Sequence, residues 1–482
     1  MNVIDLLVGG PGGDRAACVD AEAGTLSRDD LRAAASRYAA RLRAAGVPAG
    51  SRGLVVSDDS AAAVAAVLGL WWHGCVPVPV SPMLREPEIL FMAKDSNAAV
   101  AHLAAPPAKQ AVLRAELSSL VRVEDVELRG EPVDGPAPAE FAPADEVLVQ
   151  YTSGSTGTPR GARHSRAGID AVLAGFGSVL ALTPDDVVVS TAKLSFGYGF
   201  GNGLLFPLAA GASVVLLGGA VDPYAVATAL NTHHPTVLCS VPRMYAGLVQ
   251  LADRGVPVSV DRLRTAVSAG EHLPDELAAR FAEHFGTPLR NGLGATEVLH
   301  VVLADGRPVP GAAVTVRDDD GAPLPDGVQG RLHVAAASVA LGYIDRPDAT
   351  ARTFADDGAY TGDIAVVEPG TGAVRHVCRA DDLLNLGGYK MSPREIEAAV
   401  REAEGVADCA VVGETDENGL EQAVAYAVPV DGVDPEQARQ AIVRAVRARL
   451  APFKRPARVE VLDRLPVTST GKLARFKLGE PR

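Results

Sequence analysis

Residues 147–165 read VLVQYTSGSTGTPRGARHS, an apolar run that leads directly into a loop rich in glycine, serine and threonine. The apolar run predicts a buried strand. Small residues let consecutive backbone N–H groups point inward as an anion-binding nest, and the hydroxyl groups from Thr152 to Thr156 add hydrogen-bond donors. The segment therefore predicts a strand that ends in a phosphate-binding loop. A solvated Ser/Gly turn is the alternative interpretation.

Three familiar motifs do not fit this stretch or its neighbours. A G-x-x-x-x-G-K-[ST] loop fails because the position five residues after Gly154 is Pro159 and the position five residues after Gly157 is Ala162, where that motif needs its second glycine. No G-x-S-x-G surrounds a nearby serine, which disfavours a hydrolase nucleophile. The segment GYGFGNG at residues 197–203 never gives G-x-G-x-x-G, so a NAD-dependent oxidoreductase is disfavoured as well.

The composition is typical of a soluble protein with more than one domain or subdomain. The chain has 482 residues, of which 48% are hydrophobic, enough for a substantial core. A net charge of −14 disfavours a nucleic-acid partner and provides no polybasic patch for a membrane. Five scattered cysteines without C-x-x-C spacing indicate reduced cytoplasmic thiols rather than disulfides or a zinc site: Cys18, Cys75, Cys239, Cys378 and Cys409.

No targeting or membrane segment is expected. The first 15 residues lack a basic region followed by a long apolar stretch. Residues 60–84 and 194–221 are uncharged and long enough to span a bilayer, but glycines and prolines divide both into shorter pieces. We therefore expect buried helix–strand units in a cytoplasmic protein.

The secondary-structure signals change character along the chain. As far as Leu303, strand-like apolar runs alternate with helical segments such as residues 27–46, which predicts an α/β domain of mainly parallel sheets flanked by helices. Beyond residue 364, hairpin, helix and strand signals predict a small α+β domain. We place the boundary at residue 381, which gives domains 1–380 and 381–482.

The chain ends in a basic segment with a second Ser/Thr/Gly loop. Residues 451–482 carry eight Lys or Arg and three Asp or Glu, so their net charge is 8 − 3 = +5 in an acidic protein. The loop TSTGK at residues 468–472 ends in Lys472. Alone, this segment indicates a solvated basic surface. Two loops of similar chemistry, one in each predicted domain, favour a shared polyphosphate substrate.

Five segments occur in the order found in adenylate-forming enzymes. They are YTSGSTGTPRG (151–161), NGLGATE (291–297), YTGD (360–363), CRADDLLNLGGYKMSPREIE (378–397) and LPVTSTGKLARF (465–476). The sequence thus resembles, over nearly its whole length, the superfamily of acyl-CoA synthetases, peptide-synthetase adenylation domains and luciferases. Two segments look most like benzoate–coenzyme A ligases and related aryl-acid ligases: STAKLSFGYGFGNGLLFPLAAGA (190–212) and GATEVLH (294–300).

This resemblance implies an ATP- and Mg²⁺-dependent reaction on a small aromatic acid. An aromatic or arylalkenyl carboxylate would form an acyl-AMP with release of pyrophosphate, and the acyl group would pass to the thiol of coenzyme A or of phosphopantetheine on an acyl carrier protein. A carboxylate is a poor acyl donor because its leaving group would be oxide, whereas AMP is a better leaving group. Because two anions must meet, catalysis depends on charge neutralisation and positioning. The protein is expected to be a monomer or homodimer.

The resemblance also assigns roles to individual residues. Lys472 would bridge the carboxylate and the α-phosphate, Thr296 would bind the α-phosphate and Glu297 would bind Mg²⁺. The expected ATP contacts are Thr152, Ser153, Gly154, Ser155, Thr156 and Gly157 for the β- and γ-phosphates, Gly270, Glu271 and His272 for adenine, and Asp363 and Arg379 for the ribose side. The expected acid pocket is Phe196, Gly197, Tyr198, Gly199, Gly292 and His300, with His300 near the carboxylate. Taken alone, these aromatic residues and His300 fit an ordinary core, and Asp363 fits a turn.

The small domain is expected to rotate between the two steps. The resemblance places the hinge at Asp381 and brings Gly387, Gly388 and Tyr389 to a pantetheine channel after adenylation. Three features depart from the usual pattern. Arg160 stands where lysine is usual, Cys378 stands where glycine is common, and the segment after His300 is shorter than in relatives.

These departures leave the acid and the acceptor open. ATP-dependent diazotases, which activate nitrite for attack by an aromatic amine, also resemble this subgroup and are the first alternative. A non-catalytic nucleotide-binding protein is the alternative from another class. The presence of Lys472, Glu297 and Asp363 together disfavours it, because binding alone does not need all three.

Overall fold

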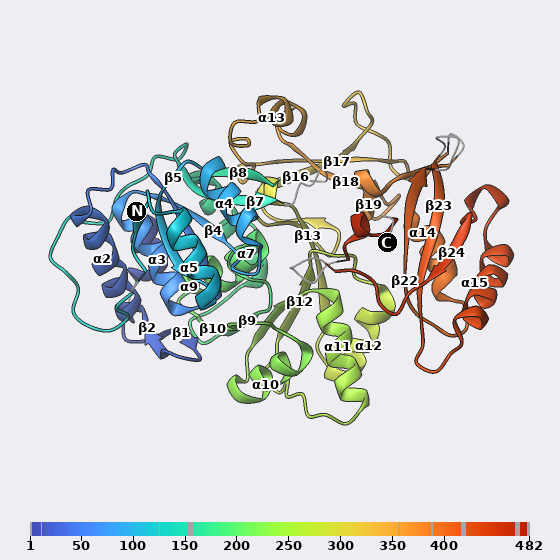
Figure 1. The fold of residues 1–482 in the computed structure, drawn as a ribbon, viewed down its shortest axis with the longest axis horizontal. Helices are drawn as coiled ribbons and strands as arrows, with labels where there is room; N and C mark the ends of the chain where they lie inside the picture. The colour runs from blue at the N-terminus through green and yellow to red at the C-terminus, as the bar shows by residue number, and fades with distance from the viewer. Residues whose placement is uncertain are drawn as a thin grey trace. The chain divides into compact units, whose positions relative to one another are not determined.

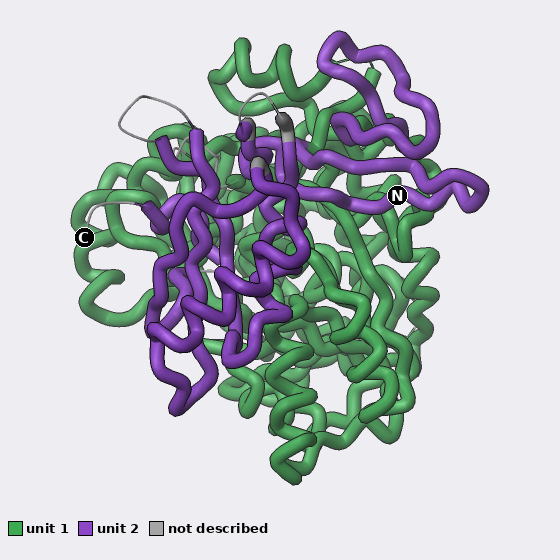
Figure 2. Tube along the Cα trace, turned by 90° about the vertical axis from the view of Figure 1, so that its right-hand side faces the viewer, with its two compact units in different colours: residues 1–314, 333–361 green, residues 315–332, 362–482 purple. Residues whose placement is uncertain are grey.

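The computed structural model describes residues 2–10, 12–124, 126–152, 159–355, 357–386, 389–415, 421–467 and 473–479. Two compact units divide the chain: Met1–Val314 with His333–Thr361, and Thr315–Leu332 with Gly362–Arg482 (Figure 2). The division passes through a four-stranded sheet of β16 (Ala312–Arg317), β17 (Gln329–Ala336), β18 (Ala359–Val367) and β19 (Val374–Arg379). The division into compact units thus places residues 362–380 in the same unit as residues 381–482. The boundary at residue 381 concerns which part moves, and it stays a prediction.

A nine-stranded sheet forms the centre of the first unit (Figure 1). Its strand order is β15 (Arg307–Pro308), β14 (Val301–Ala304), β13 (Leu289–Gly294), β12 (Thr265–Ala269), β11 (Val237–Ser240), β9 (Val187–Ser190), β10 (Ser213–Leu216), β1 (Ala16–Asp20) and β2 (Gly24–Ser27). All neighbours from β13 to β1 are parallel, and only the outer strands β2, β14 and β15 join antiparallel. The predicted mainly parallel sheet is confirmed.

Helices cover both faces of this sheet because its parallel strands are apolar on both sides. Along β11, Val237 and Cys239 belong to one core cluster and Leu238 to another, as the two-residue period of a strand requires. The Leu238 face is covered by α10 (Pro223–His233), α11 (Pro242–Asp253) and α12 (Asp275–Phe285) (Figure 1). The opposite cluster includes residues of α1 (Val3–Val8), α2 (Arg28–Ala44), α3 (Ala61–His73), α6 (Arg166–Ala174), α7 (Phe176–Leu180), α8 (Gly197–Phe200) and α9 (Phe206–Ala210).

A second parallel sheet and a hairpin complete the first unit. The sheet contains β4 (Val76–Val80), β3 (Arg52–Ser57), β5 (Ala98–Ala104) and β6 (Val121–Arg122), with α4 (Glu86–Asp95) and α5 (Pro107–Glu116) against it. β4 is an edge strand, which suits Pro77 and Pro79 because proline donates no ladder hydrogen bond. The antiparallel pair β7 (Glu146–Thr152) and β8 (Arg160–Ser165) carries the quoted loop.

The two uncharged runs form buried secondary structure, as expected. Residues 60–84 contain α3 and β4, and residues 194–221 contain α8, α9 and β10. Within the part of the chain that the structure describes, no helix is both long and apolar enough to cross a membrane.

The second unit has the predicted α+β character. Its main sheet contains β22 (Val406–Thr415), β23 (Glu421–Pro429) and β24 (Arg458–Val461), and β20 (Leu384–Leu386) pairs with β21 (Tyr389–Met391). The helices α14 (Pro393–Arg401) and α15 (Pro435–Arg449) pack on the main sheet through Ile396, Val400 and Ile442. Ser392 caps α14 by accepting a hydrogen bond from the Arg394 N–H.

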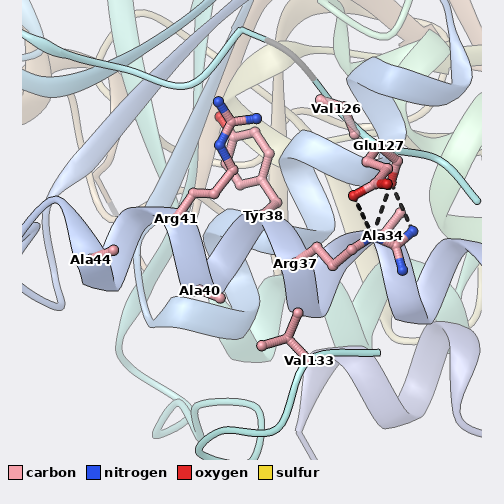
Figure 3. Close-up of a pocket in the computed structure, with 9 residues that line it drawn as sticks. All are labelled: Ala34, Arg37, Tyr38, Ala40, Arg41, Ala44, Val126, Glu127 and Val133. Carbon is pink, nitrogen blue, oxygen red and sulfur yellow. Dashed lines mark hydrogen bonds and ion pairs between the residues drawn. The ribbon is translucent and has the colours of Figure 1, made fainter. Parts of the chain in front are cut away.

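A pocket of about 320 Å³ lies along α2 (Figure 3). It is bounded by Arg37, Tyr38 and Arg41 on the helix and by Val126, Glu127 and Val133 on the facing segment. Arg37 holds that segment, because its Nη2 donates to the Glu127 carbonyl at 2.7 Å. None of the residues predicted for function lines this pocket.

Candidate active site

Three predicted loops follow parallel strands of the nine-stranded sheet. Residues 191–199 follow β9, residues 270–272 follow β12, and residues 295–300 follow β13. β9, β11, β12 and β13 are parallel neighbours, so these loops leave the same edge of the sheet. Ligands of such sheets bind beyond the carboxyl ends of the strands. The predicted adenine loop, the Thr-Glu pair and the acid pocket therefore lie at one edge.

The predicted pocket residues Tyr198 and His300 are in contact. Their ring centroids are 5.5 Å apart, and the His300 ring also lies 5.1 Å from Phe176 and 4.7 Å from Phe206. Burial lowers the pKa of His300 to about 3, so the ring is neutral and its Nε2–H donates to the Tyr198 carbonyl at 3.3 Å. A carboxylate near His300 would thus meet a neutral ring rather than a cation.

The glycines of residues 197–203 allow close packing around this histidine. A Cβ on Gly197 would lie 2.5 Å from the Leu299 carbonyl, and a Cβ on Gly201 would overlap the His300 ring. Gly201 begins a π-helical turn, Gly201–Leu205, which directly continues α8. The glycine density of this segment, which does not match the dinucleotide fingerprint, therefore has a packing explanation.

Two buried amides near the pocket were not predicted from the sequence. Gln150 is 1% exposed, and its Oε1 lies beside Gly197. Asn202 is fully buried and lies near the Tyr198 hydroxyl, whose pKa burial raises. Neither amide has a hydrogen-bond partner among the described residues. Buried polar groups without partners are rare and are expected where a ligand or water binds.

The Thr296–Glu297 pair lies in a short 3₁₀ turn, Thr296–Val298, directly after β13. The backbone is held by the Ala340 N–H, which donates to the Glu297 carbonyl at 2.9 Å. The side chain is held by the Tyr343 hydroxyl, which donates to Glu297 Oε1 at 2.6 Å. Leu299 then has a φ of +69°, a strained value for leucine that reverses the chain toward His300.

Glu297 fits a magnesium ion that arrives with ATP. No group of three or more His, Cys, Asp or Glu side chains that could hold a metal alone occurs among the residues with described positions. Mg²⁺ in nucleotide sites is usually held by one or two carboxylates together with phosphates and water. The single half-exposed carboxylate of Glu297 matches that requirement.

The remaining predicted contacts of the first unit lie on the β7–β8 hairpin, on β13, after β12 and at α8. Thr152 ends β7 and pairs with Arg160 across the hairpin, so the quoted loop starts at this point. Gly292 lies on β13 opposite Ala269 of β12, and Gly270, Glu271 and His272 follow that strand. Phe196 precedes α8 and Gly199 lies within it. Ser153, Gly154, Ser155, Thr156 and Gly157 lie outside the described residues.

In the second unit, Asp363 and Arg379 are opposite each other on the hairpin of β18 and β19. Arg379 Nη1 donates to Asp363 Oδ1 at 3.0 Å, and His376 Nε2 lies 3.1 Å from the same oxygen. Arg394 Nη1 donates to His376 Nδ1 at 2.9 Å, which leaves the ring proton on Nε2 and directed at Asp363. His376 and Arg394 were not predicted, and together they orient the predicted ribose carboxylate.

The other predicted residues of the second unit are only partly described. Asp381 is exposed in a short turn, Ala380–Asp382, and Tyr389 begins β21. Gly387, Gly388 and Lys472 lie outside the described residues. The base of the Lys472 loop is closed by pairing of Val467 with Leu473, and Arg475 Nη1 donates to Glu397 Oε1 at 2.6 Å. The segment after the loop is therefore anchored to α14.

Comparison with known families decides the identity of the fold. The sequence model of the AMP-binding enzyme family matches residues 9–344. The sequence model of the AMP-binding enzyme C-terminal domain matches residues 395–472. The chain belongs to the AMP-binding enzyme family. The predicted superfamily and fold class are confirmed.

Relatives of this AMP-binding enzyme include aryl-acid ligases. Benzoate–CoA ligase of Thauera aromatica is 34% identical over 95% of this chain and 91% of its own length. The structure of a benzoate CoA ligase from Burkholderia xenovorans LB400 has a TM-score of 0.88 at 32% identity, covering 100% of both chains. An anthranilate CoA ligase in complex with anthranoyl-AMP has a TM-score of 0.90 at 27% identity, covering 99% of this chain and 96% of that chain.

Proposed function

We propose that this AMP-binding enzyme activates an aromatic carboxylic acid with ATP and transfers the acyl group to the thiol of coenzyme A. The observation that carries the proposal is the aromatic cluster of Tyr198 and His300 at the sheet edge that also presents Glu297. A flat apolar wall beside a metal-binding carboxylate suits an acid with a planar ring. The relatives named above, two benzoate–CoA ligases and an anthranilate CoA ligase, support this substrate class.

In the first step, the acid attacks the α-phosphorus of ATP and pyrophosphate leaves. The loop after Thr152 binds the β- and γ-phosphates, and Thr296 donates to the α-phosphate. Glu297 would hold Mg²⁺, which would supply positive charge to neutralise the phosphates. Lys472 bridges the two reacting anions as a point charge, and Asp363, fixed by Arg379 and His376, accepts from the ribose hydroxyls.

In the second step, a thiol attacks the acyl carbon and AMP leaves. Rotation about Asp381 withdraws Lys472 and brings the segment from Gly387 to Tyr389 to the thiol. Coenzyme A is the proposed acceptor because it is named for the relatives that match nearly the whole chain. A carrier-protein phosphopantetheine presents the same thiol chemistry and is the second acceptor to test.

Pyrophosphate release with a panel of acids tests the acid class. We expect aromatic acids to be activated at least about tenfold better than aliphatic acids of equal length, because ring burial and stacking contribute about 1–3 kcal/mol. Equal rates for both classes, or ATP use that requires nitrite and an aromatic amine, would contradict the proposal. ATP binding without turnover of any acid would favour a non-catalytic binding protein.

A further inference from the structure

The segment Ala340–Ile344 connects the two loops proposed to contact ATP within the first unit. At one end, the Ala340 N–H donates to the Glu297 carbonyl. At the other end, the segment pairs with β8, because the Ile344 N–H donates to the Gly161 carbonyl at 2.9 Å and Tyr343 bridges Ala162. Tyr343 lies between these anchors, so its position is fixed by backbone bonds to both loops.

The Tyr343 side chain continues this connection. Its hydroxyl donates to Glu297 Oε1 at 2.6 Å, and the Arg160 guanidinium carbon lies 5.8 Å from its ring centroid. The ring is 6% exposed and packs on Phe354 with centroids 5.1 Å apart, beside α13 (Pro347–Thr353). A planar guanidinium stacks on an aromatic face, whereas an ammonium is a compact point charge. Arg160 stands where lysine is usual, and its contact with the Tyr343 ring therefore depends on the planar shape of the guanidinium.

We propose that Tyr343 is the positioning residue that orients the Glu297 carboxylate toward Mg²⁺, and that Arg160 acts on this carboxylate by holding the Tyr343 ring. The inference rests on the proposed metal-binding role of Glu297. With Oε1 fixed by the hydroxyl, Oε2 has no hydrogen bond from the residues whose positions are described, and it is the oxygen presented to the metal. Lysine at position 160 would keep the charge and lose the stacked contact.

Calorimetric titration of ATP with Mg²⁺ and in EDTA tests the hydroxyl. We expect Tyr343→Phe to weaken ATP binding about tenfold with Mg²⁺, the size of one charge-assisted hydrogen bond, and to leave binding in EDTA unchanged. The matched control is Tyr38→Phe, which removes another buried hydroxyl, one without a partner among the described residues, and should change neither value. Equal weakening with and without Mg²⁺, or no change in either, would overturn the proposal.

A double-variant cycle tests the role of Arg160. In the wild-type background, Arg160→Lys should weaken the Mg²⁺-dependent part of ATP binding. In the Tyr343→Phe background it should have no further effect on ATP binding, because both substitutions act through the Tyr343 hydroxyl. Independent, additive effects would show that Arg160 acts on ATP directly and would overturn this half of the proposal. Acid activation is assayed separately. If no acid is activated but ATP binding by the variants follows the expected pattern, the result would contradict the proposed function and support this inference.

Discussion

At the scale of single residues, Gln150 combines full burial with an amide beside the proposed acid pocket that has no hydrogen-bond partner among the described residues. Gln150→Leu keeps most of the volume and removes the desolvated amide, so we expect stability to rise by about 1–3 kcal/mol in chemical denaturation. The matched control is Gln110→Leu, because the Gln110 amide donates to the Leu103 carbonyl at 2.8 Å and its loss should destabilise. A loss of stability in both variants would show that Gln150 is satisfied by a bound group.

Lys472 is proposed to supply a charge that only the first step needs. We expect Lys472→Ala to slow acyl-AMP formation at least about a hundredfold, the effect of removing one preorganised electrostatic group. Transfer from a pre-made adenylate to coenzyme A should survive. The control is Lys454→Ala, because Lys454 forms an ion pair with Glu395 near the surface of the same unit. Equal losses in both steps would disprove the assignment.

At the scale of elements, the junction of α8 with the π-helical turn depends on close approach to His300. Gly201→Ala places a methyl group against the His300 ring, and such overpacking typically costs about 1–3 kcal/mol. Gly203→Ala is the matched control in the same turn, because its Cβ would meet only the movable end of Leu194 at 3.0 Å. We expect Gly201→Ala alone to lose both thermal stability and acid activation. Similar melting temperatures for the two variants would refute this packing.

The loop between β9 and α8 rests on a buried carboxylate. Asp59 Oδ1 accepts from the Leu194 N–H at 2.8 Å, and burial raises the pKa of Asp59 to about 7 against the opposing charge of Lys193. The folded state therefore binds the proton more tightly than the unfolded state, whose pKa is about 3.9, and stability is lost as the pH rises from about 4 to about 7.

Asp59→Asn keeps the acceptor oxygen and removes this titration. We expect the melting temperature of the wild type to fall more between pH 5 and pH 8 than that of Asp59→Asn, measured by calorimetry in matched buffers. Asp185→Asn is the control, because Asp185 is exposed and pairs with Arg15 at the surface. Parallel curves for the wild type and Asp59→Asn would show that Asp59 stays ionised.

Local sequence patterns predicted elements better than they predicted contacts between elements. The alternation of strands and helices, the helix within residues 27–46 and the hairpin beyond residue 364 depend on neighbours in sequence, and all are present. That hairpin sets Asp363 opposite Arg379 only because a bulge between Ile364 and Ala365 shifts the register by one residue, and its turn alone does not predict this pairing. Tyr343 contacts Glu297 across 46 positions, and no spacing rule indicates such a pair. Gln150 resembled any strand residue, because its lack of a partner appears only in three dimensions.

At the scale of the whole molecule, the proposed functions of the two compact units are complementary. The first unit includes Glu297 and the residues proposed for the acid pocket, and the second includes Asp363 and Lys472. Under the proposed function, the reaction needs the acid, the metal, the ribose contact and the bridging charge together. We therefore expect thioester synthesis from ATP to require residues of both units.

The central claim is that this complementary set makes an acyl-coenzyme A from an aromatic acid. The most direct measurement incubates the purified chain with the best-activated aromatic acid, ATP, Mg²⁺ and coenzyme A, and follows the products by mass spectrometry. We predict one aryl-coenzyme A thioester, one AMP and one pyrophosphate for each ATP consumed. AMP formation without a thioester for any acid, together with a coupled product that appears only with nitrite and an aromatic amine, would contradict the account.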